Sequence, residues 1–336
     1  MPPSPSLPPP PRDELEARLT VARAEAALFG GEPERTAVGR FELRRRIGRG
    51  GLGTVYAAWD PTLAREVALK VVRPDRAGGT GRMLEEAQAM ARLSHPNVVA
   101  IHEAGEHDDD VFLAMELVRG STLRQWLAAS TRTPPEVLEA FERAAKGLAA
   151  AHEAGLVHRD FKPDNVLVRD DGRVQVADFG LAATLDDDAA EGASGTLPYM
   201  APEQHAGERV GPAADQYALS VALFEALTGE HPFAGHDVES MREAKAAGRV
   251  ETPTRHVMPK HVARALTRGM DPDPAARFES VGALMAAIRV DPAQQRRRIA
   301  FIVVATVFLG IVLVGAVFQA IVFSDYIEQA RAKIDE

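Results

Sequence analysis

Two patterns of apolar and polar positions follow one another along most of the chain. Between residues 41 and 118, short segments rich in β-branched and aromatic residues surround one helical pattern over residues 81–93. After Gly120, apolar residues recur at helical spacing over residues 134–154, 213–228, 236–247, 259–269 and 278–288. The pattern predicts an α+β fold in which a mostly antiparallel sheet with one helix precedes a mostly helical region.

The residues before position 41 form a separate N-terminal segment. Residues 1–12 are rich in proline, which lacks a backbone N–H, so we expect a disordered tail or, as the alternative, a ligand for a proline-binding domain. Residues 13–40 are expected to hold a short amphipathic helix and a linker. The predicted apolar face of this helix consists of Leu15, Leu19, Ala22, Ala26 and Phe29.

A long run without charged side chains lies near the C-terminus, at residues 299–323. At about 1.5 Å per residue, such a helix can cross a hydrocarbon core about 30 Å thick; a buried core helix is the alternative. The basic segment at residues 290–298 ends in three arginines and, by the positive-inside rule, predicts that the preceding chain is cytoplasmic. Residues 324–336 would form a short extracytoplasmic tail. We therefore expect a single-pass membrane protein whose globular part is cytoplasmic.

Self-association is a further hypothesis from the same run. Ala316 and Ala320 lie on one helix face and would allow two such helices to approach closely, while Gln319 could hydrogen-bond between them. Association through the globular region is the alternative.

Composition narrows the possible chemistry. The chain has 39 basic and 48 acidic residues, and its formal net charge of −9 argues against the broad basic face of a nucleic-acid-binding protein. It contains no cysteine, so disulfides, thiolate catalysis and cysteine-ligated zinc are excluded. The substrate class has to be sought in local motifs.

The stretch IGRGGLGTV, residues 47–55, contains Gly48, Gly50 and Gly53 in the spacing G-x-G-x-x-G. A dinucleotide-binding fold requires a helix after such glycines, but here the next residues, TVYAAWD, continue as a strand. The glycines are therefore predicted to form a hairpin that lays backbone N–H groups over phosphates.

A lysine in an apolar strand is the second chemical signal. Lys70 lies in VALKVV, and an ammonium group in such surroundings requires an anionic partner. Glu86, in the helical pattern over residues 81–93, is the predicted partner. Together they would hold a positive charge against the α and β phosphates of a nucleotide.

Charged residues are concentrated in VHRDFKPDNVL, residues 157–167, and Asp178 follows in ADFG. With G-x-G-x-x-G-x-V, VALK and APE in the same order, the chain resembles the bacterial eukaryotic-like (Hanks-type) serine/threonine protein kinases. The resemblance covers residues 41–289 and implies a bilobal protein-kinase-like fold, to which one C-terminal transmembrane helix would be added.

The resemblance assigns roles to the matched residues. Asp160 is expected to accept or orient the proton of the acceptor hydroxyl, and Lys162 to steady the γ-phosphate. Asn165 and Asp178 are expected to bind Mg²⁺, which prefers oxygen ligands. ATP and Mg²⁺ are the expected cofactors, with a nucleotide site made of Ile47, Gly48, Gly50, Gly53, Val55, Ala68, Lys70, Glu86, Met115, Glu116 and Val118.

The same resemblance implies regulatory residues. Arg159, beside the catalytic aspartate, is typical of kinases that require a phosphate on the activation loop, and Ser194 is the predicted site. Asp186, Asp187, Asp188 or Glu191 is the rival source of negative charge. Thr196 would contact Asp160, which together with Lys162 favours serine and threonine acceptors.

Three further matches are expected to be structural. Asp215 would anchor the catalytic loop from below, and Glu203 would pair with Arg277.

The sequence thus predicts a membrane-tethered kinase that phosphorylates serine or threonine on proteins and is capable of autophosphorylation. A membrane-tethered ATP-binding pseudokinase scaffold is the alternative from another class. A small-molecule phosphotransferase of related fold is less favoured, because GTLPYMAPE matches the segment that forms a peptide-docking shelf in protein kinases.

Overall fold

The computed structural model describes the chain in separate ranges, residues 14–30, 35–50, 53–72, 79–108, 110–179, 197–233, 237–251, 253 and 258–289, with further positions between 306 and 323. The chain divides into two compact units, Met1–Met285 and Ala286–Glu336. The first unit contains a sheet-rich N-terminal lobe followed by a helical lobe. The expected tails and the basic segment, residues 1–12, 290–298 and 324–336, lie outside the described residues.

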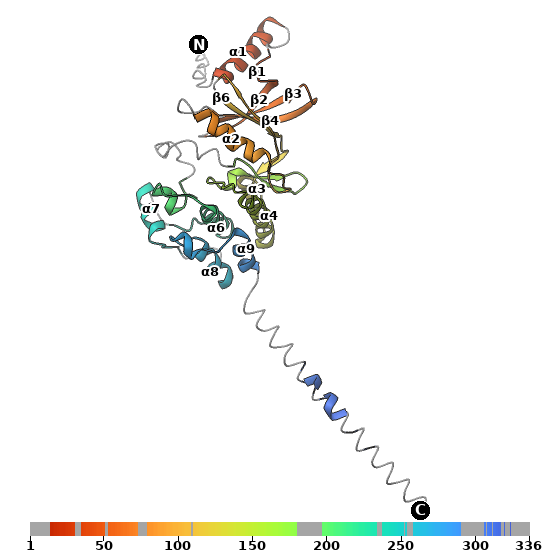
Figure 1. The fold of residues 1–336 in the computed structure, drawn as a ribbon, viewed down its shortest axis with the longest axis vertical. Helices are drawn as coiled ribbons and strands as arrows, with labels where there is room; N and C mark the ends of the chain where they lie inside the picture. The colour runs from red at the N-terminus through yellow and green to blue at the C-terminus, as the bar shows by residue number, and fades with distance from the viewer. Residues whose placement is uncertain are drawn as a thin grey trace, which may run out of the picture. The chain divides into compact units, whose positions relative to one another are not determined.

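A six-stranded antiparallel sheet forms the N-terminal lobe (Figure 1). Its strands are β1 (Ala37–Val38), β2 (Phe41–Gly50), β3 (Gly53–Asp60), β4 (Arg65–Val72), β5 (Ile101–His107) and β6 (Asp110–Glu116). They lie in the order β1-β2-β3-β4-β6-β5, and helix α2 (Gly79–Ala91) packs beside β5 and β6. The predicted sheet with one helix is confirmed.

The two faces of this sheet have different roles because side chains alternate along each strand. In β4, Leu69 points to a hydrophobic core, whereas Ala68 and Lys70 point to the opposite face. The core cluster consists of Val38, Phe41, Leu43, Tyr56, Ala58, Val67, Leu69, Val71, Phe112 and Ala114. Helix α1 (Glu14–Phe29) packs on this cluster through Leu15 and Leu19, so it covers the face that does not carry Lys70.

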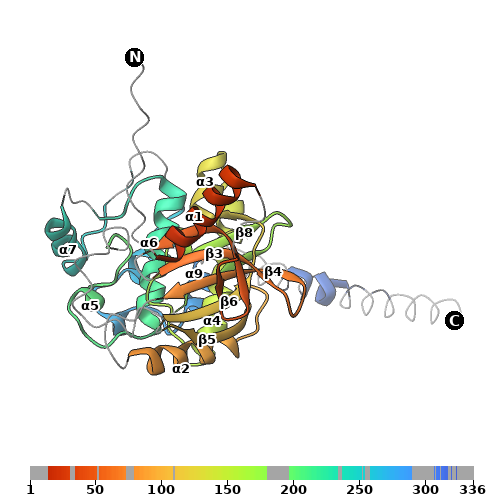
Figure 2. The same cartoon turned by 90° about the horizontal axis from the view of Figure 1, so that it is seen from above.

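Helix α1 lies beside the sheet (Figure 2), and its predicted apolar face packs inward only in part. Ala22 is buried, but Phe29 is 84% exposed, contrary to the expectation that it packs inward. Polar contacts attach the earlier turns of α1 to the sheet. Glu16 pairs with Arg46, and the Arg23 guanidinium donates to the backbone of β2. The attachment to the sheet is therefore concentrated before the last turn of the helix.

The helical lobe contains the helices α3 (Leu123–Ala129), α4 (Pro134–Glu153), α5 (Pro202–His205), α6 (Pro212–Thr228), α7 (Val238–Ala246), α8 (Lys260–Gly269) and α9 (Val281–Arg289). A small sheet has the order β7-β8-β9, with β7 at Gly120–Thr122, β8 at Val166–Arg169 and β9 at Val174–Val176. Helix α6 is buried along nearly its whole length because apolar residues are distributed around it and buried polar residues such as Asp215 and Gln216 are hydrogen-bonded. It forms the centre of this lobe.

The connection between α2 and β5 is bonded to the helical lobe. Val99 N–H donates to Val176 O at 2.9 Å, and Val176 N–H donates to Asn97 O at 2.8 Å. The Asn97 side chain also donates to Val174 O at 2.8 Å. Gly147 of α4 lies so close that a Cβ there would be 2.3 Å from Asn97 O. The two lobes are therefore joined at a backbone-to-backbone contact.

The predicted membrane span at residues 299–323 falls mostly outside the described positions. Within the part of the chain that the structure describes, no helix is both long enough and apolar enough to cross a membrane.

Gly147→Ala should destabilise the fold, because the added methyl group would overlap the Asn97 carbonyl and the backbone has to move. We expect a loss of about 1–3 kcal/mol in the free energy of unfolding, measured by urea titration of the full chain. Gly81→Ala is the matched control, since nothing lies within 4 Å of its Cβ position. A loss of stability in both variants alike would contradict the proposed close contact.

Candidate active site

The glycine motif forms the turn between β2 and β3, as predicted. Gly48 pairs with Val55 and Gly50 with Gly53, while residues 51 and 52 lie outside the described residues. Gly53 has φ +146°, and a Cβ there would be 2.2 Å from the Val71 carbonyl oxygen. Only glycine fits this position, because a side chain would collide with the backbone of β4.

Lys70 is a buried cation on the open face of the sheet. It lies opposite Val55 on β3 and Leu113 on β6, and its side chain is 6% exposed. Its ammonium group is 3.1 Å from a carboxylate oxygen of Asp178. The sequence prediction missed this ion pair; the expected pairing with Glu86, which is half-buried on α2, stays a prediction.

A mostly apolar pocket lies on the same face as Lys70. Ala68, two residues before Lys70, lies opposite Ala57 and Met115 on this face. The pocket is lined by Lys70, Met90, Leu93, Val98, Val99, Ile101, Leu113, Met115, Ala177, Asp178 and Phe179. Most of these apolar residues carry no sequence signal of a site, because they are brought together only when α2, the sheet and the segment after β9 pack against one another.

The segment at the end of β6, where Met115, Glu116 and Val118 are expected to bind the nucleotide, is partly engaged by contacts within the fold. The Glu116 N–H donates to Ala100 O at 2.9 Å, and the Glu116 carboxylate pairs with Arg169. This N–H is therefore engaged and does not serve as a free donor to an adenine edge. The Glu116 carbonyl and the backbone of Val118 stay predicted contacts.

The loop between α4 and β8 places three polar side chains together. The Lys162 ammonium is 2.8 Å from one carboxylate oxygen of Asp160 and 3.0 Å from the other. The Asn165 side-chain amide donates to the Asp160 carboxylate at 3.1 Å and to its backbone carbonyl at 2.8 Å. These contacts fix the direction of the Asp160 carboxylate, which is the property that a proton acceptor needs.

Asn165 and Asp178 are brought together by the backbone. Ala177 N–H donates to Asn165 O at 2.9 Å, so the residue before Asp178 is bonded to Asn165 itself. Because the Asn165 NH₂ group is used by Asp160, its amide oxygen is the group left to bind a cation. In the described ranges, no cluster of three or more histidine, aspartate or glutamate side chains could hold a metal ion alone. This donor set fits Mg²⁺ that completes its coordination with phosphate and water oxygens.

Asp215 lies under this loop and is almost completely buried. Its carboxylate accepts from the backbone N–H groups of His158 and Arg159, both at 2.8 Å, and is 2.7 Å from His152 Nε2. Above it, the His158 ring lies between those of Phe161 and Phe179. Asp215 thus holds the loop from below, at the position that the sequence predicts.

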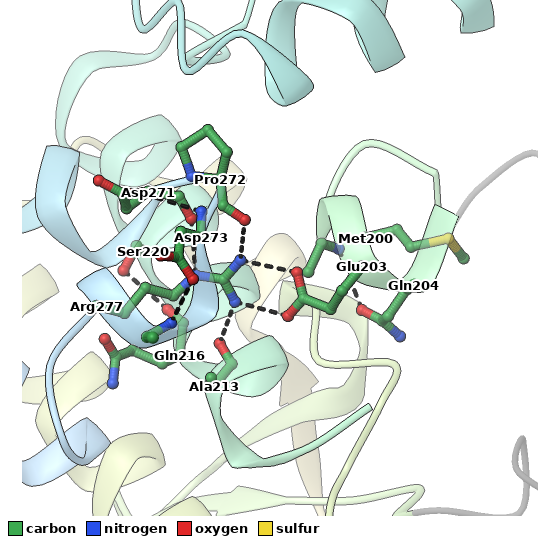
Figure 3. Close-up of polar contacts among 12 residues, drawn as sticks. Met200, Glu203, Gln204, Ala213, Gln216, Ser220, Asp271, Pro272, Asp273 and Arg277 are labelled. Atoms are coloured by element: carbon green, nitrogen blue, oxygen red, sulfur yellow. Dashed lines mark hydrogen bonds and ion pairs between the residues drawn. The ribbon is translucent and has the colours of Figure 1, made fainter. Parts of the chain in front are cut away.

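Glu203 and Arg277 form the predicted ion pair (Figure 3). Both guanidinium NH₂ groups donate to the Glu203 carboxylate at 2.7 Å, and both side chains are buried. Arg277 also donates to backbone carbonyls of Ala213 and Asp271, at 2.8 Å each. The arginine therefore joins α5, α6 and the turn before α9.

Arg124 of α3 was not predicted from the sequence. Its guanidinium donates to the Asp164 carboxylate at 2.8 Å and to the Tyr199 hydroxyl at 2.9 Å. Tyr199 donates in turn to Glu225, and burial together with this carboxylate raises the pKa of the Tyr199 hydroxyl. The loop of Asp160 is thereby bonded to the turn at Leu197–Met200.

The predicted regulatory residues Ser194 and Thr196 lie outside the described residues. Arg159 is described: it has φ 65°, in the left-handed region, and its Nε is buried with no hydrogen-bond partner among the described residues.

Comparison with known proteins identifies the family to which these site residues belong. Residues 41–286 match the protein kinase domain family, which is more than two thirds of the chain. The chain belongs to the protein kinase family. Serine/threonine-protein kinase PrkC of Bacillus subtilis is 36% identical over 262 residues, which are 75% of this chain and 40% of that protein. Serine/threonine-protein kinase PknD of Mycobacterium tuberculosis is 37% identical over 256 residues, 73% of this chain and 39% of that protein.

The fold agrees with a solved kinase domain. The crystal structure of the Mycobacterium tuberculosis PknI kinase domain aligns with a TM-score of 0.60 and 27% sequence identity, and covers 77% of this chain and 99% of that chain. The present chain spans only about 40% of the length of PrkC and PknD. These relatives place its kinase domain in the bacterial serine/threonine class, for which ATP and Mg²⁺ are the cofactors.

Arg277→Met should destabilise the kinase domain strongly, because Glu203 would be left buried and unpaired. We expect a loss of about 3–5 kcal/mol in the free energy of unfolding, measured by urea titration. Adding Glu203→Gln to this variant should recover part of the loss. Arg173→Met, at an exposed ion pair, is the control and should change little. Equal effects at the two arginines would contradict a central role for the buried pair.

Proposed function

We propose that this chain transfers the γ-phosphoryl group of ATP to serine or threonine hydroxyls of proteins, itself included. The observation that carries the proposal is the arrangement of Asp160, Lys162 and Asn165 beside the Lys70–Asp178 pair. Phosphoryl transfer depends mainly on positioning and on neutralising charge at the phosphate oxygens, and this site supplies a fixed carboxylate, two cations and two oxygen ligands.

In the proposed reaction, the acceptor hydroxyl lies against the Asp160 carboxylate, which takes its proton. The hydroxyl oxygen forms a bond to the γ-phosphorus, and the bond from that phosphorus to the β–γ bridging oxygen breaks, which releases ADP. Lys162 stabilises the charge on the transferred group. Lys70 is placed to bind the α and β phosphates of the nucleotide.

Asn165 and Asp178 would hold Mg²⁺, which supplies positive charge at the phosphate oxygens. The pseudokinase scaffold is not favoured, since Lys70, Asp160 and Asp178 are all present and Asp160 and Lys70 are oriented by direct contacts.

Asp160→Asn should reduce transfer of labelled phosphate from Mg·ATP by at least about a hundred-fold, because the amide cannot accept the proton. The measurement uses the full chain with myelin basic protein as acceptor, followed by identification of the labelled amino acid. The rise in melting temperature on addition of Mg·ATP should persist, since Asp160 faces the acceptor.

Asp171→Asn is the control, as this exposed aspartate pairs with Arg173 away from the site. Labelled tyrosine would contradict the serine/threonine assignment. A wild-type chain that binds ATP but labels nothing would favour the scaffold.

We further propose that activation involves the loop that follows Asp178. The buried Nε of Arg159 supports this idea, because a nearby anion would satisfy it. Ser194 is the proposed phosphorylation site, and the acidic residues at positions 186–188 and 191 are the alternative source of charge.

We also propose that residues 299–323 tether the kinase to the bacterial cytoplasmic membrane, with the kinase domain on the cytoplasmic side and residues 324–336 beyond the membrane. The described positions in this run support it: residues 312–316 are helical, and Phe308, Leu309 and Leu313 are 67%, 68% and 65% exposed. Exposed apolar side chains on a helix are stable in lipid. Self-association through Ala316, Gln319 and Ala320, or through the kinase domain, remains part of this proposal.

Changing both Leu313 and Val314 to arginine should release the full chain from bacterial membranes, because each charge costs about 2.5–3.5 kcal/mol at the centre of a bilayer. The measurement is the fraction that stays with membranes after an alkaline wash. Leu28→Arg, at a surface leucine of α1 that is 77% exposed, is the control and should change nothing. Release of the wild-type chain by the wash would contradict the tether.

A further inference from the structure

The turn Leu197–Met200, here called the docking turn, belongs to the segment that supports the acceptor peptide in protein kinases. It is bonded to the loop of Asp160 at two places. Gln204, just after the turn, donates to Arg159 O at 2.8 Å, and Arg124 bridges Tyr199 to Asp164. A shift of the docking turn would therefore change where an acceptor lies relative to Asp160.

Lys245 of α7 holds the docking turn from inside the protein. Its side chain is completely buried, and its ammonium group donates to Leu197 O at 2.7 Å and to Met200 O at 2.8 Å. The same nitrogen lies 6.0 Å from the centre of the Tyr217 ring. One cation thus binds both ends of the turn.

A lysine at this position costs free energy, because its charge is buried. No carboxylate among the described residues pairs with Lys245, and burial lowers the pKa of its ammonium group to about 7. Packing alone would be served by a methionine or leucine, which bring no charge into the interior. The presence of a lysine here is therefore explained by its hydrogen bonds to the two carbonyls.

We propose that Lys245 is a positioning residue for the acceptor polypeptide: by binding the carbonyls of Leu197 and Met200, it fixes the docking turn in the form that receives the acceptor. This inference rests on the proposed function and specifies how the same site takes its substrate. The side chains of Leu197, Pro198 and Met200 are only partly buried, so the turn presents apolar surface to that substrate.

The charged and titratable groups around Lys245 come from α5, from α6 and the segment after it, and from α7. His205 of α5 and His231 after α6 both have a lowered pKa because of burial, about 4 for His205, so both are neutral above pH 7. Burial raises the pKa of the Tyr217 hydroxyl on α6. Arg242, on α7 itself, donates to the carbonyl of His205. Within this set, Lys245 is the group whose charge changes near neutral pH.

The test is Lys245→Met in the full chain, with myelin basic protein as acceptor. We expect the KM for the acceptor to rise roughly ten-fold, the factor that corresponds to about 1.4 kcal/mol. The KM for ATP and the rate of ATP hydrolysis without acceptor should stay within about two-fold, which a general structural defect would not allow. Lys146→Met, at an exposed lysine paired with Glu142, is the matched control.

A second arm uses the wild-type chain alone. Its acceptor KM should rise between about pH 6 and about pH 9, because deprotonation of Lys245 turns its two charge-assisted hydrogen bonds into weaker neutral ones, while in Lys245→Met this rise should disappear. An unchanged acceptor KM in the variant overturns the inference. If the variant does not fold, a flat acceptor KM for the wild type over this pH range overturns it equally. A wild-type chain that labels no acceptor refutes the proposed function as well.

Discussion

The buried carboxylate of Asp215 is the interaction on which the active loop depends. It accepts two backbone N–H groups and contacts His152, so its charge is solvated by the protein rather than by water. One of those N–H groups belongs to Arg159, whose φ of 65° is unfavourable for a residue with a side chain and costs about 1–3 kcal/mol. Asp215 offsets this strain, and Asp160 takes its direction from the backbone that is held there.

From this loop, contacts extend toward the proposed sites of both substrates. On the nucleotide side, Asn165 binds the backbone next to Asp178, and Asp178 meets Lys70 of the sheet. On the acceptor side, Gln204 and Arg124 join the loop to the docking turn. The two sets of contacts share the same short segment of backbone, which explains why so many charged residues occupy residues 157–167.

Much of the fold and of the candidate site could be predicted because their signals are local. The glycine hairpin, the loop of Asp160 and the long helices are each encoded by neighbouring residues. What the sequence missed concerns distant partners, such as the Lys70–Asp178 pair and the hydrogen bond from the Glu116 N–H to Ala100. One expectation was wrong, because Phe29 is exposed rather than packed inward. Lys245 donates to the Leu197 carbonyl, 48 residues away, but from the sequence alone it would be predicted to be an ordinary surface lysine of a helix.

The bonding of Asn97 and Val99 to β9 has a consequence for movement between the lobes. The backbone of the sheet lobe is attached to the helical lobe there and again at the chain connection after Glu116. With two attachments, the lobes can rotate about the line that joins them but cannot simply separate. Any opening between the lobes is then a rotation about this line, in which the part of the sheet farthest from the line moves the most.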